Sequence, residues 1–299
     1  MRGPHNIWRL IRTGATFQRT GAMGVVLDAM EAPAPIRLAA RVMGLPFAWL
    51  GLKGDPSQPP VTRALTALGP AYIKFGQILS TRPDVIGDDL ALQLQVLQDK
   101  LAPFSTAEAR AEMERELGEP VEALFSDFSD SVAAASIAQV HQAHRVDTGQ
   151  KVAVKVLRPG IEKAFRKDID AFYFVARVVE VLSPSSRRLH PTDVIAHFEG
   201  VVMGELDLRL ESASASEFAD NTEGDDHFVV PRVIWDLSAR RVMTLDWAEG
   251  IPAHDLAAIN AAGHDRAVLA ERILRMFLQH ALRDGFFHAD MHQGNLKIA

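Results

Sequence analysis

The chain has 299 residues, 47% of them hydrophobic and 23% charged, which is the balance of a globular protein and not of a disordered one. Its formal charge of −6 argues against a nucleic-acid partner bound by a broad basic face, and the absence of cysteine excludes disulfides and thiolate metal sites. A chain of this length can bury a substantial core and is expected to fold as two or three units.

The N-terminal stretch predicts helices broken by glycine, with a proline-rich linker at Gly54–Pro60. Its start is basic but has neither the continuous apolar core nor the cleavage site of a signal peptide. The most apolar window, 36–52, holds two arginines and a proline and is shorter than the ~20 residues of a spanning helix. A basic amphipathic face from Ile7 to Trp49 either rests on a membrane surface or packs on the body of the protein as a helical hairpin.

The region up to about residue 120 has a helical pattern almost throughout. Helices are expected at 62–68, 71–82 and 88–101, the last from a stripe of leucines. Ser105–Glu108 is a capping-box signature that begins another helix, and Gly118 is placed to end it.

From Ser129 onward, short alternating runs replace the helical pattern. Runs at 132–141 and 151–156 flank a turn at 147–149 and predict a β-hairpin. The remaining expected elements are long helices at 161–181, 192–218 and 264–282 and two more strands at 228–235 and 241–246. The predicted fold class is therefore α+β.

Val152–Lys155 reads V-A-V-K and matches the V-A-I-K pattern of the third strand in protein kinases, whose lysine pairs nucleotide phosphates. A strand holds the ammonium group rigidly, and a compact cation suits phosphate. The tetrapeptide alone is a weak signal, because a lysine on a half-buried strand is usually just solvated.

A second motif, H-x-D-x-x-x-x-N, lies at His288, Asp290 and Asn295. It has the spacing of a kinase catalytic loop, in which the aspartate orients the attacking group and the asparagine holds a metal. The alternatives are an Asx turn without function and a zinc site of His288, Asp290 and His292, which would indicate a metal hydrolase. The kinase interpretation is favoured because both motifs occur in kinase order.

The helix expected after residue 192 carries a run of acidic residues. Asp207 and Glu211 are four apart, so on a continuous helix they share a face and repel unless a cation lies between them. Glu205 would face Arg209. A solvated acidic face explains the run equally well in isolation, but beside the strand lysine a Lys155–Glu211 ion pair is the better interpretation.

The segment ahead of the strand lysine lacks the glycines with which kinases cover a nucleotide. It reads Ala133-Ala134-Ala135-Ser136 instead. Alanine resists positive φ, so this loop cannot copy the usual flap, whereas Ser136 and the backbone amides remain able to contact phosphate. A D-F-G motif does not follow the catalytic-loop motif in this sequence.

Taken together, these motifs resemble the UbiB family of atypical protein-kinase-like proteins, which is linked to ubiquinone (coenzyme Q) biosynthesis. The resemblance covers about residues 60–299. It includes the family's KxGQ motif at Lys74–Gln77, its alanine-rich loop at 133–141, its ExD motif at Glu205–Asp207 and a catalytic loop at 287–295. Met291 and Gln293 stand where that loop usually has prolines.

The resemblance implies a protein-kinase-like fold with a helical N-terminal extension, a complete N-lobe and only the start of a C-lobe. The four parts would be an N-terminal helical region at 1–54 on a membrane surface, the KxGQ extension at 55–130, the N-lobe at 131–249 and the start of the C-lobe at 250–299. Because the family continues into D-F-G and a full C-lobe, the chain is expected to be a fragment or a truncated product.

The resemblance also implies roles for single residues. Lys74 and Gln77 would reach the nucleotide cleft and meet Glu205 and Asp207. Lys155, paired with Glu211, would hold the α- and β-phosphates. The other expected contacts are the loop of Ala133, Ala134, Ala135 and Ser136 at the phosphates, a hinge with Asp246 and Ala248 at the adenine, Asp290 as the catalytic aspartate and Asn295 as a Mg²⁺ ligand.

The implied activity is the binding of ATP or ADP with Mg²⁺ and slow ATP hydrolysis in support of ubiquinone biosynthesis. The alternative is a non-catalytic nucleotide-binding scaffold for the same pathway. The implied partners are enzymes of the lipid or isoprenoid-quinone pathway and a membrane surface, with no nucleic acid. The expected location is peripheral, on the cytoplasmic side of the inner membrane, because no spanning helix is visible in the sequence.

Overall fold

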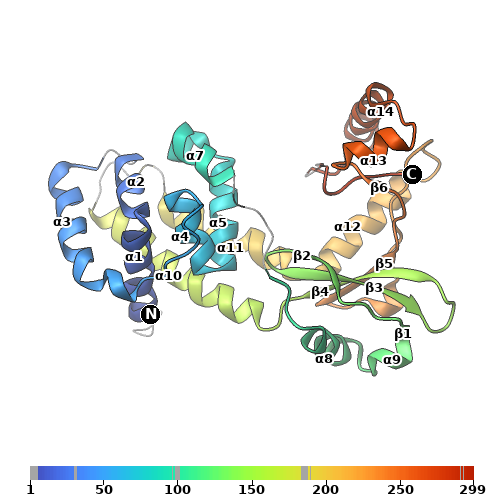
Figure 1. Cartoon of the computed structure of the whole chain (residues 1–299), viewed down its shortest axis with the longest axis horizontal. Helices are drawn as coiled ribbons and strands as arrows, with labels where there is room; N and C mark the ends of the chain where they lie inside the picture. Colours follow the sequence, from blue (N-terminus) through green and yellow to red (C-terminus); the bar gives the residue numbers. More distant parts are fainter. Residues whose placement is uncertain are drawn as a thin grey trace. The chain divides into compact units, whose positions relative to one another are not determined.

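The computed structural model of the chain describes residues 6–29, 32–95, 97, 102–182, 188, 190–289, 291 and 293–299. The described residues form helices, a five-stranded sheet and a two-stranded sheet, as the α+β class predicts (Figure 1). The chain divides into two compact units. The first is Met1–Pro103, Ala134–Ala138 and Leu157–Leu206, and the second is Phe104–Ala133, Gln139–Val156 and Asp207–Ala299. The domain boundaries at 54, 130 and 249 stay predictions.

The first unit is helical. Its helices are α1 (Asn6–Thr20), α2 (Ala22–Ala29), α3 (Ala34–Gly44), the 3₁₀ helix η1 (Leu45–Leu50), α4 (Pro60–Leu68), α5 (Pro70–Ser80), α6 (Pro83–Ile86), α7 (Asp88–Gln95), α10 (Ile161–Leu182) and α11 (Pro191–Glu205). Helix α1 packs on η1, α4 and α10, while α5 packs on α4, α7 and α10. Aromatic rings at Tyr72, Phe75, Phe172 and Phe198 join α5 to α10 and α11.

The second unit contains the sheet, in which β1 (Phe125–Ser126), β3 (Ala138–Arg145), β4 (Lys151–Leu157) and β5 (Val242–Asp246) lie in the order β1–β3–β4–β5 and β2 (Ser131–Ala134) pairs with β3. Its other elements are α8 (Thr106–Leu117), α9 (Val121–Leu124), α12 (Leu208–Asn221), the 3₁₀ helix η3 (Trp235–Leu237), β6 (Ile251–Pro252), α13 (Leu256–Ala261), α14 (Arg266–Gln279), the π-helix η4 (His280–Asp284) and β7 (Lys297–Ile298).

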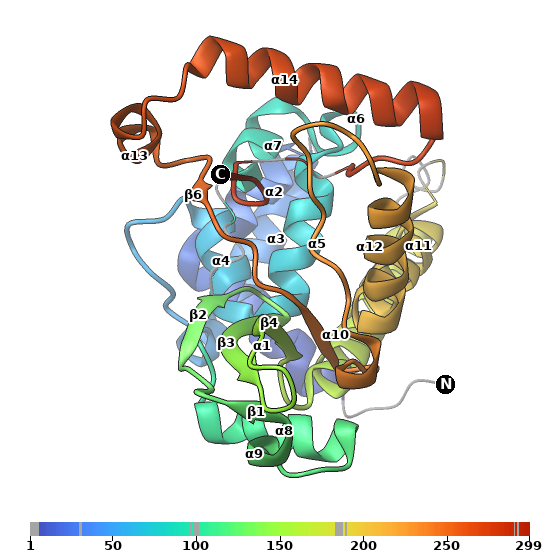
Figure 2. The same cartoon turned by 90° about the vertical axis from the view of Figure 1, so that its right-hand side faces the viewer.

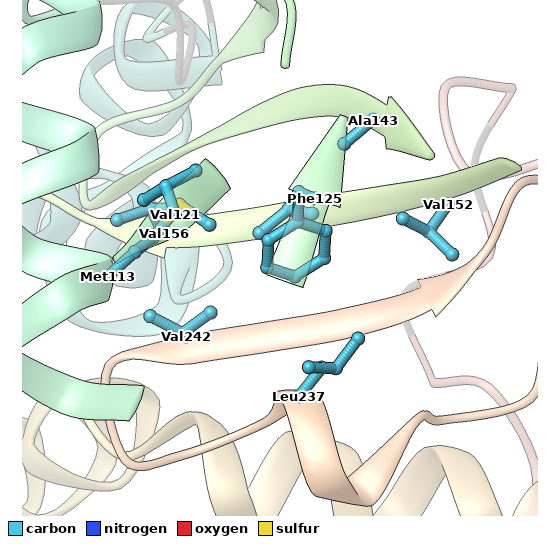
Figure 3. Packing of buried hydrophobic residues seen from close by; sticks show 9 residues of the cluster. Met113, Val121, Phe125, Ala143, Val152, Val156, Leu237 and Val242 are labelled. Carbon is cyan, nitrogen blue, oxygen red and sulfur yellow. The ribbon is translucent and has the colours of Figure 1, made fainter. Parts of the chain in front are cut away.

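Alternation along β4 sets the two faces of the sheet. Val152, Val154 and Val156 are fully buried, and the lysines at 151 and 155 lie on the opposite face because successive strand side chains point to opposite sides. The valines pack with residues of α8, α9 and the neighbouring strands, among them Met113, Val121, Phe125, Ala143 and Val242 (Figure 3). Both cartoon views put α8 and α9 against one side of the sheet (Figures 1 and 2).

Elements with strong local signals match the sequence prediction. Ser105 and Glu108 form the reciprocal capping box at the start of α8, and Gly118 ends this helix in the left-handed conformation. The expected hairpin is β3–β4, closed by a hydrogen bond from the Arg145 amide to the Gln150 carbonyl.

The single helix predicted at 192–218 is wrong, because the chain leaves the helical conformation at Leu206 and Asp207. Leu206 is buried, and the amide of Leu208 donates to the carbonyl of Arg240 at 2.8 Å. Asp207 is extended, with φ −125° and ψ 94°, and its carboxylate caps α12 by accepting from the Arg209 amide. Asp207 and Glu211 therefore do not share a face of one continuous helix.

The strand predicted at 228–235 is also wrong. This segment runs beside β5 but forms one isolated bridge, Val233 to Leu245, before it turns into η3. Pro231 has no amide hydrogen to donate to a ladder, which is consistent with so short a pairing. The helix predicted at 264–282 is α14, which changes to the π-helix at His280. No helix within the described ranges is both long and apolar enough to cross a bilayer.

Candidate functional site

The strand lysine and the helix glutamate form the ion pair that the sequence suggests. Lys155 Nζ lies 2.6 Å from Glu211 Oε1 and 2.7 Å from Oε2, so the ammonium is shared by both oxygens. Strand β4 supplies the lysine from the face of the sheet opposite the valine core, and the first turns of α12 supply the glutamate. The lysine side chain remains 26% exposed, so the pair is accessible to a ligand.

The segment after β5 lies beside the start of β4. Trp247 donates its amide to the Lys151 carbonyl at 3.2 Å, which continues the pairing of the two strands. The carboxylate of Asp246 accepts from Gln150 Nε2 at 2.6 Å. The Ala248 carbonyl accepts from Lys297 Nζ at 2.6 Å and retains a second lone pair.

Two lysines lie near the indole ring of Trp247, a feature that the sequence analysis missed. The ammonium nitrogens of Lys151 and Lys297 lie 4.6 Å and 4.9 Å from the ring centroid, within the range of cation–π attraction. Lys151 is also 3.2 Å from Glu249. The sequence shows Lys297 two residues after Asn295, but it does not indicate that this side chain reaches Trp247 and the Ala248 carbonyl.

The alanine-rich segment is a short turn between β2 and β3, closed by a hydrogen bond from the Ala135 amide to the Ala138 carbonyl at 2.8 Å. The non-glycine residues with positive φ in the described chain are Asp127, His190 and His227, so none of the three alanines has that conformation. Ala133 is exposed, Ala134 and Ala135 are partly buried, and Ser136 is 3% exposed.

The KxGQ residues lie in the first unit. Lys74 Nζ on α5 is 2.7 Å from Oε1 of Glu205, the last residue of α11. Gln77 donates from Nε2 to the Leu97 carbonyl at 3.3 Å. The predicted pairing of Glu205 with Arg209 is wrong, because the helix break turns Glu205 to Lys74 and leaves Asp207 as the partner of Arg209.

Asp207 binds Arg209 through two charged hydrogen bonds, of 2.9 Å from Nε and 2.6 Å from Nη2. These bonds hold the pKa of the Asp207 carboxyl below its usual value. The Lys74–Glu205 pair is thus part of the first unit, while Asp207 and the Lys155–Glu211 pair belong to the second.

Asp290 and His292 lie outside the described residues. His288 and Asn295 are exposed, in the irregular segment that leads to β7. This segment is anchored by the pairing of β6 with β7, where a side chain on Gly250 would come within 2.7 Å of the Ile298 carbonyl. No group of three or more His, Cys, Asp or Glu that could hold a metal occurs among the residues described, and the metal-hydrolase alternative stays untested because two of its three ligands are not among them.

Comparison with known proteins places the chain among atypical kinase-like proteins. A family model described as the ABC1 atypical kinase-like domain matches residues 96–299. A protein of Marinobacter nauticus named probable protein kinase UbiB is 44% identical over 81% of this chain and 45% of its own length. Its namesake in Pseudomonas aeruginosa is 39% identical over 97% of this chain and 55% of its own length. The chain thus spans about half the length of these curated relatives.

A solved structure agrees with this result. The Rv3197 protein of Mycobacterium tuberculosis, in complex with erythromycin, matches with a TM-score of 0.56 and 29% identity. The match covers 75% of this chain and 56% of the other. The predicted kinase-like fold is therefore confirmed, and the chain belongs to the ABC1 atypical kinase-like family, together with the UbiB proteins that it resembles.

Proposed function

We propose that the chain binds ATP or ADP with Mg²⁺ and hydrolyses ATP slowly, as the nucleotide-binding part of a UbiB-type atypical kinase. The observation that carries this proposal is the ion pair between Lys155 and Glu211. In kinases the corresponding pair must be in place for the lysine to hold the phosphates. A lysine locked between two carboxylate oxygens on a central strand needs little rearrangement to accept phosphate oxygens in addition.

The residues present suit a magnesium nucleotide. Lys155 would hold phosphate, the backbone near Asp246 and Ala248 would meet the adenine, and Asn295 would bind Mg²⁺. Magnesium is usually held by one or two protein oxygens together with the substrate phosphates, so a sparse set of protein ligands fits it. When bound, the ion neutralises charge on the phosphates. Asp290 would orient the attacking group.

Calorimetric titration with Mg·ADP and Mg·ATP tests the proposal. Lys155→Met should weaken binding by roughly tenfold or more, because a charged hydrogen bond to phosphate is lost. Glu211→Gln should weaken it less, since the ammonium remains. Lys163→Met, the same change at an exposed position of α10, should leave the affinity unaltered. A wild-type chain that shows no Mg²⁺-dependent nucleotide binding overturns the proposal.

A nucleotide-binding scaffold without turnover is the second candidate, and the alanine-rich turn favours it. The alanines of this turn do not have positive φ, so its backbone does not have the conformation with which a glycine-rich loop covers the phosphates. The two candidates differ in turnover. Release of phosphate that Asp290→Asn abolishes supports the enzyme, whereas tight binding without release in wild type supports the scaffold.

We extend the proposal to ubiquinone biosynthesis at a membrane on the strength of the family resemblance. Ubiquinone content in a strain that lacks its own UbiB relative, measured with and without the gene for this protein, tests the pathway. The expected partners are enzymes of the lipid or isoprenoid-quinone pathway. Support for a peripheral position on the cytoplasmic side of the inner membrane comes from exposed apolar side chains on α1, α3 and η1.

A further inference from the structure

Four nitrogen atoms from three side chains contact the carboxylate of Asp225, which follows α12 by one short turn. His280 Nε2 contacts Oδ2 at 3.1 Å, and Gln279 Nε2 donates to Oδ1 at 3.0 Å. Arg283 donates from Nη1 to Oδ1 at 2.6 Å and from Nη2 to Oδ2 at 2.9 Å, the two parallel bonds of a bidentate pair. All of these donors come from the end of α14 and the π-helix after it.

The contact between Asp225 and His280 is largely shielded from solvent. The side chains of Asp225 and His280 are 12% and 3% exposed. Phe218 of α12 and Phe228 pack against the imidazole ring, with centroid distances of 5.2 Å and 5.0 Å. The hydrogen bonds from Arg283 hold the pKa of Asp225 below its usual value. A partly buried carboxylate that accepts from several donors at once restricts the position of each of them.

Arg283 extends the connection to the body of α12. Its Nη2 also donates to the carbonyl of Asn221, the last residue of that helix, at 3.1 Å. Its Nε and Nη2 also donate to Asp284 at 2.6 Å and 2.7 Å. These two bonds restrict the orientation of the guanidinium at the end of the π-helix. The π-turn is one of the local helix defects that frequently mark functional sites.

The two elements joined in this way carry the two halves of the proposed site. Helix α12 presents Glu211 to Lys155, and the π-helix ends at Asp284, ahead of His288 and Asn295 in the chain. We propose that Asp225 is a positioning residue that fixes the segment of His288 and Asn295 relative to the helix of the Lys155–Glu211 pair. This inference rests on the proposed nucleotide function, but it concerns a contact that the motifs do not contain.

The test compares Asp225→Asn with wild type in two measurements. Asparagine keeps the size of the side chain but turns an NH₂ group toward donors, so the four contacts cannot all persist. Hydrogen–deuterium exchange at residues 286–289 and 293–295 should become about tenfold faster, with strands β3 to β5 unchanged. The gain in ADP affinity on adding Mg²⁺ should fall by about tenfold, while the affinity without Mg²⁺ changes by less than about threefold.

The matched control is Glu271→Gln, which makes the same change of carboxylate to amide on α14. Glu271 pairs with Arg275 one turn along the same helix, and both side chains are exposed. Asp225→Glu, which keeps the charge, should restore part of the Mg²⁺ effect. If wild type responds to Mg²⁺ and Asp225→Asn responds equally, the positioning role is refuted. If wild type binds no nucleotide, the proposed function has failed, and unchanged exchange in Asp225→Asn would refute the anchoring separately.

Discussion

Asp168 is a partly buried acidic residue of the first unit that pairs with an arginine. It lies on α10 with its side chain 13% exposed and forms an ion pair with Arg9 of α1. Burial raises the pKa of Asp168 to about 6, although the guanidinium of Arg9 lowers it. The hydroxyl groups of Tyr72 and Thr13 lie nearby at 2.7 Å from each other, and burial raises the pKa of Tyr72 to about 12.

The raised pKa of Asp168 predicts a fall in stability as pH increases. The folded state holds the Asp168 proton between the unfolded pKa of 3.8 and the folded value of about 6, so the free energy of unfolding decreases through that window and is level above it. Asp168→Asn should remove this dependence. Urea unfolding from pH 4 to pH 7 should show the wild type losing on the order of 2 kcal/mol relative to the variant. If the free energies of unfolding of wild type and variant differ by a constant amount from pH 4 to pH 7, the prediction is contradicted. Asp89→Asn, at an exposed position, is the control.

At the scale of elements, the sequence predicts those helix ends and turns that are formed by interactions between residues close together in the chain. The capping box at Ser105 and the β3–β4 hairpin depend on residues within a few positions of each other, and both are found. The break at Leu206 depends on a hydrogen bond to the Arg240 carbonyl, a residue distant in sequence, so a periodic pattern could not show it. The pairing of Lys155 with Glu211 was identified through the kinase motif, whereas the contacts of Asp225 carry no motif at all.

Gly76 of the KxGQ motif has a packing role that the structure makes visible. A side chain at this position of α5 would lie 2.4 Å from Leu97 Cδ1 and 2.6 Å from Leu65 Cδ1, both on buried residues. Glycine here allows α5 to approach α4 and the segment after α7 closely. Gly76 therefore allows close packing of the helix that carries Lys74 and Gln77.

Gly76→Val should destabilise the first unit by about 2 kcal/mol, because a well-packed core must shift to admit three carbons. The matched control is Gly200→Val in α11, where an added Cβ meets no atom within 4 Å. Thermal unfolding of both variants measures the difference. Equal melting temperatures of the two variants would show that Leu65 and Leu97 move aside for the valine without loss of stability, which would contradict the prediction.

At the scale of the whole molecule, the N-terminal helices carry a set of large apolar side chains that are exposed. The exposed large side chains there are Ile7 and Trp8 of α1, Ile36, Leu38 and Val42 of α3, and Phe47 and Trp49 of η1. Arginines accompany them at 12, 19, 37 and 41. Aromatic and aliphatic side chains mixed with arginine suit the interface of an anionic lipid surface, where apolar burial and charge attraction act together.

The chain should therefore bind vesicles of phosphatidylcholine with phosphatidylglycerol more tightly than vesicles of phosphatidylcholine alone, and added salt should weaken the difference. The variant Trp8→Ser with Trp49→Ser removes two indole rings that are 60% and 73% exposed. It should bind roughly thirtyfold more weakly in a co-sedimentation assay, since each of the two rings contributes on the order of 1 kcal/mol. Trp235→Ser is the matched control, because this indole is 50% exposed but belongs to η3 of the second unit. Equal loss in both variants would mean that any exposed tryptophan suffices, and no loss in either would leave the N-terminal helices without a membrane role.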